Sequence, residues 1–412
     1  MQSIPFTTNF FADDTQPTRT DALAGDATAD VLIVGAGVVG LSCAYVLREA
    51  GLDVAVVERD HVGFASSGRH MGHITPHMWN YGSKEPHVLA AWAHGCLDWI
   101  EELLATEDID CDFARCPFWL PAATRAEAEV VRRVAAYYAG LGVPVRSVEA
   151  NDFDLVTFRT WGAVVLEDQA RAHPYRMVRG LRDAVLRKGV RLYEGTRVNS
   201  VEGGPRVTVT TPGGTLRAPK AVLALNAYSG QFPFLRHYTT PMHTYTIVTE
   251  PLDEDTARTV GPPPAEDLLI YDMAASRDEE HFYQRLRGDG RLFFGGGGTT
   301  PALAPDRMAP DGNDAMFRRI HAEMSRRYPS LGNVRVEAGW GGPICATVRG
   351  QPIVADVPEH ENIVMAIVGN GNGIGLGTNA GRLVKGLVLG LDTLDESTRA
   401  FLEYCGESVD AA

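Results

Sequence analysis

The sequence predicts an α/β fold, α+β overall, in which a parallel nucleotide-binding core is interleaved with an antiparallel sheet. In residues 30–58, an apolar strand, a glycine-rich turn, a helix and a second apolar strand follow one another directly. In residues 241–300, alternating strands are joined by turn residues, which is typical of antiparallel sheets. Because an antiparallel sheet cannot extend a parallel core without interruption, the two segments predict two domains.

Residues 30–58 carry a dinucleotide-binding fingerprint. The glycines Gly35, Gly37 and Gly40 have the spacing G-x-G-x-x-G. They lie between an apolar strand, Val31–Val34, and a helix predicted over residues 38–50, and a second strand, Val54–Val57, ends in the acid Glu58. The glycines allow a tight turn, close approach of a pyrophosphate and close packing of helix on strand. A glycine-rich turn without a ligand is the alternative, but the complete order of elements favours a Rossmann-like dinucleotide site.

The type of dinucleotide is narrowed by Glu58. A carboxylate at this strand end accepts hydrogen bonds from free ribose hydroxyls, which argues against NADP although Arg59 follows directly. NAD and FAD share the fingerprint, so this segment leaves both open.

Length and composition set outer limits. The 412 residues exceed one ordinary core, and 45% apolar and 22% charged residues are typical of a soluble globular protein. The net charge of −14 disfavours nucleic acid or an anionic membrane as a partner. No apolar run approaches the about 20 residues of a membrane span, and no signal peptide is recognised. The six cysteines lack zinc spacing, so we expect free thiols, a cytoplasmic protein and no metal site.

Periodicity predicts the remaining elements. Helices are predicted over residues 86–108, 124–140, 175–188 and 314–328, the second with a capping box of Thr124 and Glu127. Short strands are predicted at 118–120, 143–148, 162–167, 190–193, 198–202, 207–211 and 221–225. Residues 1–29 are expected to form an extension pinned to the body by Phe6, Phe10 and Phe11. Residues 62–76 have no regular period, and a loop directly after Glu58 is expected near the ligand end of the sheet.

A second glycine-rich loop lies near the C-terminus. Gly369, Gly371, Gly373 and Gly375 follow a strand and precede a predicted long helix. A helix N-terminus of this kind offers free amide donors and the positive end of the helix dipole. Two such sites are hard to explain with NAD, whereas FAD would place its pyrophosphate at the first and its ring at the second. A purely structural glycine-rich connection is the alternative.

The chain resembles the family of FAD-dependent amine and amino-acid oxidases that includes D-amino-acid, glycine and sarcosine oxidases, and most of all its γ-glutamylputrescine oxidase-like branch. The motifs that carry the resemblance are Ala65–Gly72 (ASSGRHMG, with one extra serine), His173-Pro174, Thr249–Leu252 (TEPL), Gly290–Gly296 (GRLFFGG), Trp340–Gly342 (WGG), and Gly371 with Gly373. They occur in the family's order over nearly the whole chain.

The resemblance implies a discontinuous architecture. The FAD-binding domain would comprise residues 30–85, 150–235 and 330–395, the substrate domain residues 86–149 and 236–329, and residues 1–29 an N-terminal extension. The implied reaction is oxidation of a carbon–nitrogen bond by hydride transfer from the α-carbon to flavin N5, followed by hydrolysis of the imine. The amine must react unprotonated, so a dry pocket or a neutral histidine helps more than a strong base.

Motif position and resemblance together give the candidate site. The predicted cofactor-binding residues are Gly35, Gly37, Gly40, Glu58, Arg59, Ser67, Gly68, Arg69, His70, Gly72, Gly371, Asn372, Gly373, Ile374 and Gly375. The predicted catalytic residues are His73, Tyr245, Tyr271 and Trp340. Structural roles for the histidines and core roles for the strand aromatics are the alternatives. His70, His73 and Cys345 are possible covalent tethers, but non-covalent FAD is favoured because Cys345 is one position away from the family's cysteine.

Two departures from the family bear on the substrate. Where glycine oxidase-like members carry a carboxylate-binding arginine in G-L-R-P, this chain has Gly342-Pro343-Ile344-Cys345, which favours an amine over a standard α-amino acid. The lysine that promotes oxygen reduction in some oxidases has no counterpart in Leu292–Phe294, which leaves oxygen and quinone both open as acceptors. A D-amino-acid or 2-hydroxy-acid dehydrogenase, and a non-catalytic FAD-binding subunit of a heteromeric complex, are the alternative functions.

Overall fold

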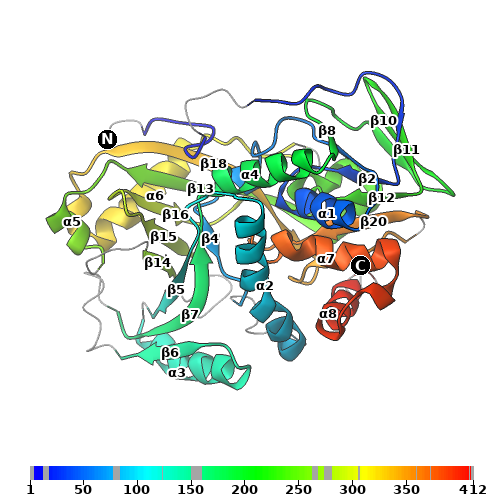
Figure 1. Cartoon of the computed structure of the whole chain (residues 1–412). Coiled ribbons are helices and arrows are strands. Elements are labelled where there is room, and N and C mark those ends of the chain that lie inside the picture. Colours follow the sequence, from blue (N-terminus) through cyan, green and yellow to red (C-terminus); the bar gives the residue numbers. More distant parts are fainter. Residues whose placement is uncertain are drawn as a thin grey trace.

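The computed structural model describes residues 4–12, 18–77, 84–122, 124–149, 160–261, 268–272, 281–304, 307–358, 360–371, 373–407 and 409. The α-helices of these segments are α1 (Val38–Glu49), α2 (Pro86–Thr106), α3 (Arg125–Gly140), α4 (Pro174–Arg187), α5 (Glu254–Arg258), α6 (Asp314–Arg327), α7 (Ala380–Leu389) and α8 (Glu396–Gly406). The strands form three sheets. Figure 1 shows α1, α4 and α7 close together towards one half of the molecule, α5 and α6 at the far end of the other half, and α3 beside β6 at the bottom.

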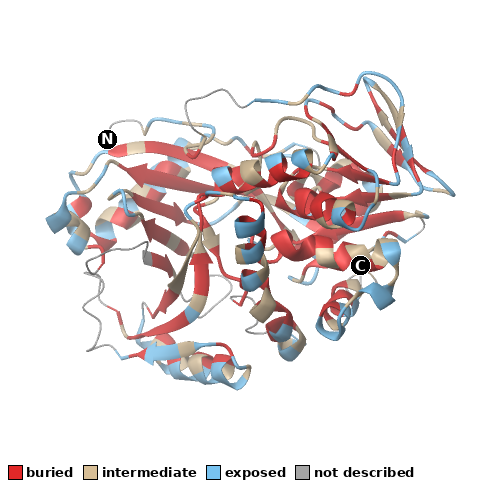
Figure 2. Ribbon diagram, viewed as in Figure 1, coloured by how far each residue is buried: buried red, intermediate tan, exposed pale blue. Residues whose placement is uncertain are grey.

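The six-stranded sheet is the parallel core that the sequence predicts. Its order is β19 (Ile353–Asp356), β20 (Ile363–Ile367), β12 (Lys220–Leu223), β2 (Val31–Val34), β3 (Val54–Val57) and β8 (Arg191–Tyr193). Only the edge strand β19 pairs antiparallel. In β2, Val31 and Ile33 belong to the apolar cluster of the helices, and Leu32 and Val34 belong to the cluster on the opposite face. Burial on both faces explains the continuous apolar runs of these strands (Figure 2).

A small sheet covers the second face of this core. Its order is β1 (Ala27–Thr28), β11 (Gly214–Ala218), β10 (Val207–Thr211) and β9 (Ser200–Glu202). The predicted strand at 207–211 is confirmed as β10, which pairs antiparallel with β11, and it alternates buried and half-buried side chains as expected for a sheet with one covered face.

The largest sheet contains the antiparallel strands predicted in residues 241–300. Its order is β17 (Thr300–Pro301), β13 (Thr239–Thr249), β16 (Leu292–Gly296), β15 (Phe282–Leu286), β14 (Leu268–Tyr271), β5 (Ala114–Pro121), β7 (Ala163–Arg171) and β4 (His73–Ile74), with β18 (Val336–Thr347) paired to β13 and β6 (Val145–Val148) to β7. The predicted capping box of α3 is present, because the Thr124 side chain accepts from the Glu127 amide and the Glu127 side chain accepts from the Thr124 amide.

The sheets do not follow the predicted domain boundaries. Strands β7 and β18 pair within the largest sheet, although residues 150–235 and 330–395 were assigned to the FAD-binding domain. Conversely, α2 lies in the predicted substrate domain but packs in the apolar cluster of α1 and α7. Periodicity identifies an element without naming its packing partner. The two-domain division itself remains a prediction.

The second glycine loop also differs from expectation. The helix after it, α7, begins only at Ala380 and has 10 residues. A 3₁₀ turn, Gly377–Asn379, precedes it. The Thr378 amide donates to the Ile374 carbonyl at 3.0 Å, so helical hydrogen bonding starts within the glycine loop although regular α-helix starts later.

Residues 4–12 and 18–29 form an N-terminal strap along the body. The Thr7 amide donates to the Gly339 carbonyl at 3.0 Å, which ties the strap to β18. Phe10 stacks on Trp340 with ring centroids 5.6 Å apart, and Phe11 stacks on Phe293 at 5.2 Å. Phe10 and Phe11 therefore pin the extension as predicted, whereas the Phe6 side chain is exposed.

A buried carboxylate joins the strap to the core. Glu194, directly after β8, accepts hydrogen bonds from the amides of Thr20 and Val62, each at 2.8 Å, and from Arg182 at 3.1 Å. Burial alone would raise the pKa of Glu194, but these hydrogen bonds and the Arg182 charge hold it below its usual value. The carboxylate thereby fixes both the strap and the start of the loop over residues 62–76.

The cysteines are free thiols, as the sequence predicts. All six cysteines are free, and only Cys116 is not fully buried. Within the described segments, no helix has both the length and the apolar character needed to cross a membrane.

Candidate active site

The first glycine loop is held by close backbone contacts. Gly35 has φ +101°, in the left-handed region that favours glycine, and a Cβ there would lie 2.6 Å from the Ala224 carbonyl oxygen. A Cβ on Gly40 would lie 1.9 Å from the Gly35 carbonyl oxygen, so α1 packs on the turn only without a side chain. Gly37 is different, because its Cβ would meet only the Ser67 hydroxyl, at 3.1 Å.

Glu58 closes one side of the loop. Its Oε2 accepts from the Ala36 amide at 2.9 Å and its Oε1 from the Asp60 amide at 3.0 Å. Burial raises the pKa of Glu58. Arg59 pairs with Asp60 at 2.9 Å and lies over the ring of Tyr228 at 4.3 Å.

One cavity of about 1380 Å³ connects the glycine loops with the largest sheet. The predicted residues that line it are Gly35, Gly37, Glu58, Arg59, Ser67, Arg69, His70, His73, Tyr271, Trp340, Gly371, Gly373 and Ile374. The remaining predicted residues within the described segments are not on its wall: Gly40, Gly68, Gly72, Tyr245 and Gly375. Asn372 lies outside the described residues.

The glycines away from the wall permit close packing behind it. A Cβ on Gly68 would lie 2.2 Å from the Gly63 carbonyl oxygen, and one on Gly72 would lie 2.1 Å from the Ala172 carbonyl oxygen. Gly375 packs against Pro76. These glycines let the loop over residues 62–76 and the second glycine loop lie close to their neighbours.

Strand alternation corrects the placement of Tyr245. Tyr245 is fully buried on the α6 face of β13, where its ring meets Phe317, and its hydroxyl donates to the Pro310 carbonyl at 3.1 Å. The neighbours Thr244 and Thr246 line the cavity instead. A side-chain spacing of 2 along a strand does not tell which face of the strand carries the site.

A row of side chains on the largest sheet forms the cavity wall opposite the glycine loops. Across neighbouring strands, Tyr271 pairs with Tyr283, Tyr283 with Gly295, Gly295 with Thr246, and Thr246 with Trp340. The rings of Tyr271 and Tyr283 stack with centroids 5.9 Å apart. A Cβ on Gly295 would lie 2.5 Å from the Tyr283 ring, so this glycine makes room for the ring.

The two histidines of the loop have opposite tautomers. The Nδ1 of His70 accepts from the Gly72 amide at 2.9 Å, so the neutral ring carries its proton on Nε2. The His73 ring is hydrogen-bonded to the Gln284 backbone, and this hydrogen bond raises the pKa of the ring, as donation from the ring to a carbonyl does. Because Nε2 has no partner, the donor is Nδ1, and Nε2 keeps its lone pair. Neither Nε2 atom has a partner. Burial, with the nearby Arg285 charge, lowers both pKa values to about 3, so both rings are neutral near neutral pH.

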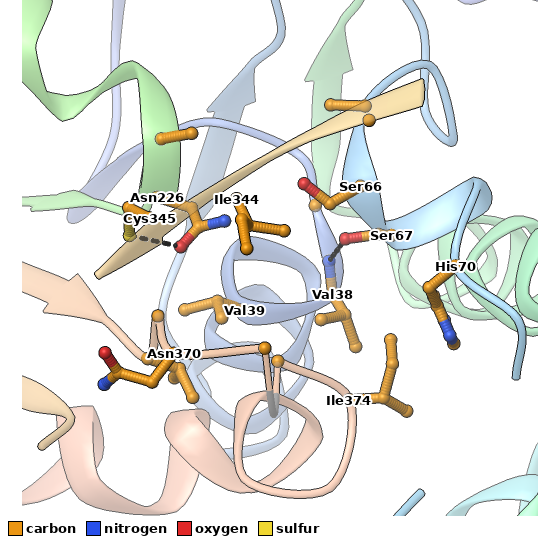
Figure 3. A pocket seen from close by; sticks show the side chains of 18 of the residues that line it. Val38, Val39, Ser66, Ser67, His70, Asn226, Ile344, Cys345, Asn370 and Ile374 are labelled. Atoms are coloured by element: carbon orange, nitrogen blue, oxygen red, sulfur yellow. Dashed lines mark hydrogen bonds between the residues drawn. The ribbon is translucent and has the colours of Figure 1, made fainter. Parts of the chain in front are cut away.

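Cys345 faces the second glycine loop. Its thiol donates to the Asn226 side-chain oxygen at 2.9 Å (Figure 3), and burial raises its pKa to about 12. Its carbonyl accepts from the Asn370 amide at 2.7 Å, and the Asn370 side chain bonds the amide and hydroxyl of Thr347. A protonated, hydrogen-bonded thiol is a poor nucleophile.

A network of two buried side chains around one half-buried carboxylate lies beside Trp340, and it was not predicted from the sequence. Arg69 Nη1 lies 2.7 Å from Asp311 Oδ2, and His243 Nε2 lies 2.8 Å from Asp311 Oδ1. Burial alone would raise the pKa of Asp311, but the His243 hydrogen bond and the Arg69 charge lower it. Asp311 lies in an irregular loop 242 residues after Arg69, and no local pattern in the sequence points to it.

The residues present fit a flavin dinucleotide. At Gly37 a Cβ would meet only the Ser67 hydroxyl within 4 Å and at Gly373 nothing, and both glycines line the cavity, so a ligand can approach the backbone at both loops. Figure 3 shows Val38 and Val39 of α1 on one side of this space and Asn370 and Ile374 of the second loop on the other. The volume exceeds that of a site for a drug-sized molecule.

Comparisons with known proteins agree with this geometry. The model of a family described as DAO, FAD dependent oxidoreductase, matches residues 30–387. The chain is similar to the gamma-glutamylputrescine oxidoreductase of Escherichia coli (strain K12), with 28% identity over 90% of this chain and 86% of that protein. Its fold is similar to the crystal structures of glycine oxidase from Geobacillus kaustophilus (TM-score 0.76, 20% identity, 90% of this chain and 96% of that one) and of L-proline dehydrogenase from P. horikoshii (0.77, 16%, 94% and 98%).

Proposed function

Because this chain belongs to the DAO family of FAD-dependent oxidoreductases, we propose that it oxidises the carbon–nitrogen bond of a primary or secondary amine, or of an amino-acid derivative. The observation that carries the proposal is the character of the cavity wall. Two neutral histidines line the cavity, and its buried arginine is already paired with a carboxylate. The wall thus accommodates an uncharged amine without offering a free buried cation to a carboxylate.

The chain's residues would hold FAD in an extended arrangement. Gly35 and Gly37 at the start of α1 would bind the pyrophosphate, and Glu58 would accept from the ribose. The second loop, Gly369–Gly373, would contact the ring together with Ile344 and Val39. The chemistry that FAD supplies when bound is acceptance of a hydride from the substrate carbon.

The histidine tautomers suggest how the substrate nitrogen is recognised. A lone pair on His73 Nε2 can accept a hydrogen bond from an amine N–H, and the Nε2–H of His70 can donate to an acceptor. With a pKa of about 3, His73 is too weak a base to hold a proton, so the substrate would bind as the free amine. Water then hydrolyses the imine product. The name of the relative, gamma-glutamylputrescine oxidoreductase, supports an amine-bearing substrate.

The test is anaerobic bleaching of the flavin absorption band by a panel of polyamines, N-methyl amines, D- and L-amino acids and 2-hydroxy acids. Bleaching by amines supports the proposal, and ammonia or methylamine release would identify the bond that is cleaved. Bleaching by hydroxy acids alone would contradict it and favour the dehydrogenase alternative. A flavin absorption band that no compound of the panel bleaches would favour the alternative of a non-catalytic FAD-binding subunit.

Cofactor binding is tested separately with Gly37→Leu. This side chain would enter the cavity, because only the Ser67 hydroxyl lies within 4 Å of a Cβ at residue 37. We expect a folded protein that is purified without yellow colour. Gly288→Leu is the matched control, because a Cβ at residue 288 meets nothing within 4 Å and Gly288 lies away from the cavity wall. A Gly37→Leu protein with full flavin content would refute the assignment of the first loop.

A further inference from the structure

We propose that Asp311 is a specificity-determining residue that masks the charge of Arg69 and so keeps the cavity from binding carboxylates. The inference deepens the proposed function, because it names why the site would take amines rather than carboxylate-bearing compounds. Only its relevance to substrate choice rests on that function, because masking of the Arg69 charge can be measured by ligand binding without turnover.

Arg69 is a buried cation on the cavity wall. Its side chain is 3% exposed, and the guanidinium lies over the ring of Phe64 at 4.7 Å. Nη1 donates to Asp311 Oδ2 at 2.7 Å and to the Gly341 carbonyl at 3.3 Å. Because water is largely excluded here, an uncompensated charge would act strongly on a ligand in the same cavity.

Asp311 is fixed in place by partners on both of its oxygens. Oδ1 contacts Nε2 of His243, which is 1% exposed on β13, and Oδ2 contacts Arg69. Gly341 permits this packing, because a Cβ there would lie 2.9 Å from both the Asp311 carbonyl oxygen and the His243 ring. Asp311 does not line the cavity itself. It therefore touches no ligand directly, and its charge compensates that of Arg69 from behind the wall.

The other arginines of the wall do not have this character. Arg59 pairs with its neighbour Asp60, and Arg197 and Arg349 are exposed. Among the described arginines that line the cavity, Arg69 alone is buried. A buried guanidinium without a partner binds a carboxylate strongly and repels an ammonium group. Removing the Asp311 charge should therefore convert an amine-accepting cavity into a carboxylate-binding one.

The experiment compares Asp311→Asn with the wild-type holoprotein. The probes are propionate and its uncharged, nearly isosteric amide, propionamide, and their dissociation constants are measured from perturbation of the flavin absorption band and by calorimetry. We expect propionate to bind the variant at least about tenfold more tightly, since a charged hydrogen bond is gained, while propionamide binds as before. Glu250→Gln is the matched control, because Glu250 pairs with Arg335 on the surface, and it should change neither constant.

A double variant separates masking from a structural role. Adding Arg69→Gln to Asp311→Asn should return propionate affinity to the wild-type value, because the unmasked cation is then gone. Unchanged propionate affinity in Asp311→Asn, or equal tightening for propionate and propionamide, would overturn the proposal, since neither reflects charge.

A variant that does not fold still leaves a decisive measurement. If Asp311→Asn does not fold, the double variant, in which neither charge of the pair remains, is compared with the wild type: equal propionate affinity supports a masked arginine, and a tenfold or greater loss shows that Arg69 already binds carboxylates and overturns the proposal. Failure of every amine to bleach the flavin, with propionate tightening still observed, would defeat the proposed function while leaving the masking of Arg69 intact.

Discussion

The two walls of the cavity differ in the atoms that form them, backbone atoms in one and side-chain atoms in the other. At the glycine loops the wall is mainly backbone, and contacts such as that between Gly40 and Gly35 determine its shape. At the largest sheet the wall is a row of side chains from four different strands, including Tyr271, Tyr283 and Trp340. A backbone wall tolerates almost no added atom, whereas a side-chain wall depends on partners far away in the sequence. The comparison predicts different responses to substitution.

The largest effect is expected from a single methyl group at the backbone wall. In Gly40→Ala the added Cβ would lie 1.9 Å from the Gly35 carbonyl oxygen, so α1 must move away from the turn. We expect loss of bound flavin and destabilisation by about 3 kcal/mol or more. The measurements are flavin content and urea unfolding. Gly95→Ala in α2, where a Cβ meets nothing within 4 Å, should be neutral or slightly stabilising. A yellow, stable Gly40→Ala protein would show that the backbone wall is more tolerant than we infer.

Glu194→Gln tests the connection between the walls, because Glu194 fixes the Val62 amide at the start of the loop that reaches both. The substitution leaves the buried Arg182 with only the exposed carboxylate of Asp183 as a charged partner and should lower the free energy of unfolding by about 2 kcal/mol. Since the folded-state pKa of Glu194 is lowered, its contribution is present above the unfolded-state pKa and is lost as pH falls through the folded-state value. The difference between wild type and variant should therefore shrink in acid. A difference that grows on acidification would contradict the ion pair.

The smallest effect is expected from the ionisation of the histidines on the side-chain wall. With pKa values of about 3, His70 and His73 stay neutral, so the rate of flavin reduction should show no inflection near pH 6.5 that depends on them. Stopped-flow reduction across this range, in wild type and His73→Asn, measures it. An inflection that disappears in the variant would show that His73 titrates. Because the pKa values of both histidines are lowered in the folded state, their ionisation costs no stability above about pH 6.5. Below that pH the unfolded chain takes up protons on these histidines first, so the free energy of unfolding falls as the pH drops towards 3.

The same comparison explains what the sequence predicted. The first glycine loop, its two strands and Glu58 lie within 30 residues, so their local order was enough to predict the parallel core correctly. The side-chain wall depends on register between distant strands, which one sequence does not encode in any local period. Tyr245 was therefore assigned to the wrong face, and Asp311, whose meaning comes only from contact with Arg69 and His243, was missed. The pairing of β7 and β18 within the largest sheet is likewise set by register between distant strands.

The N-terminal strap has a consequence for the order in which the chain assembles during synthesis. Residues 5–7 pair with Gly339, and β1 pairs with β11, so these residues find partners that are synthesised much later than they are. Strand β2 likewise needs β12 beside it before the parallel core can close. Domains near the N-terminus of a chain commonly fold first. Here residues 5–7 of the strap can dock only after translation has passed Gly339 in β18, so this part of the strap reaches its place late although it is made early.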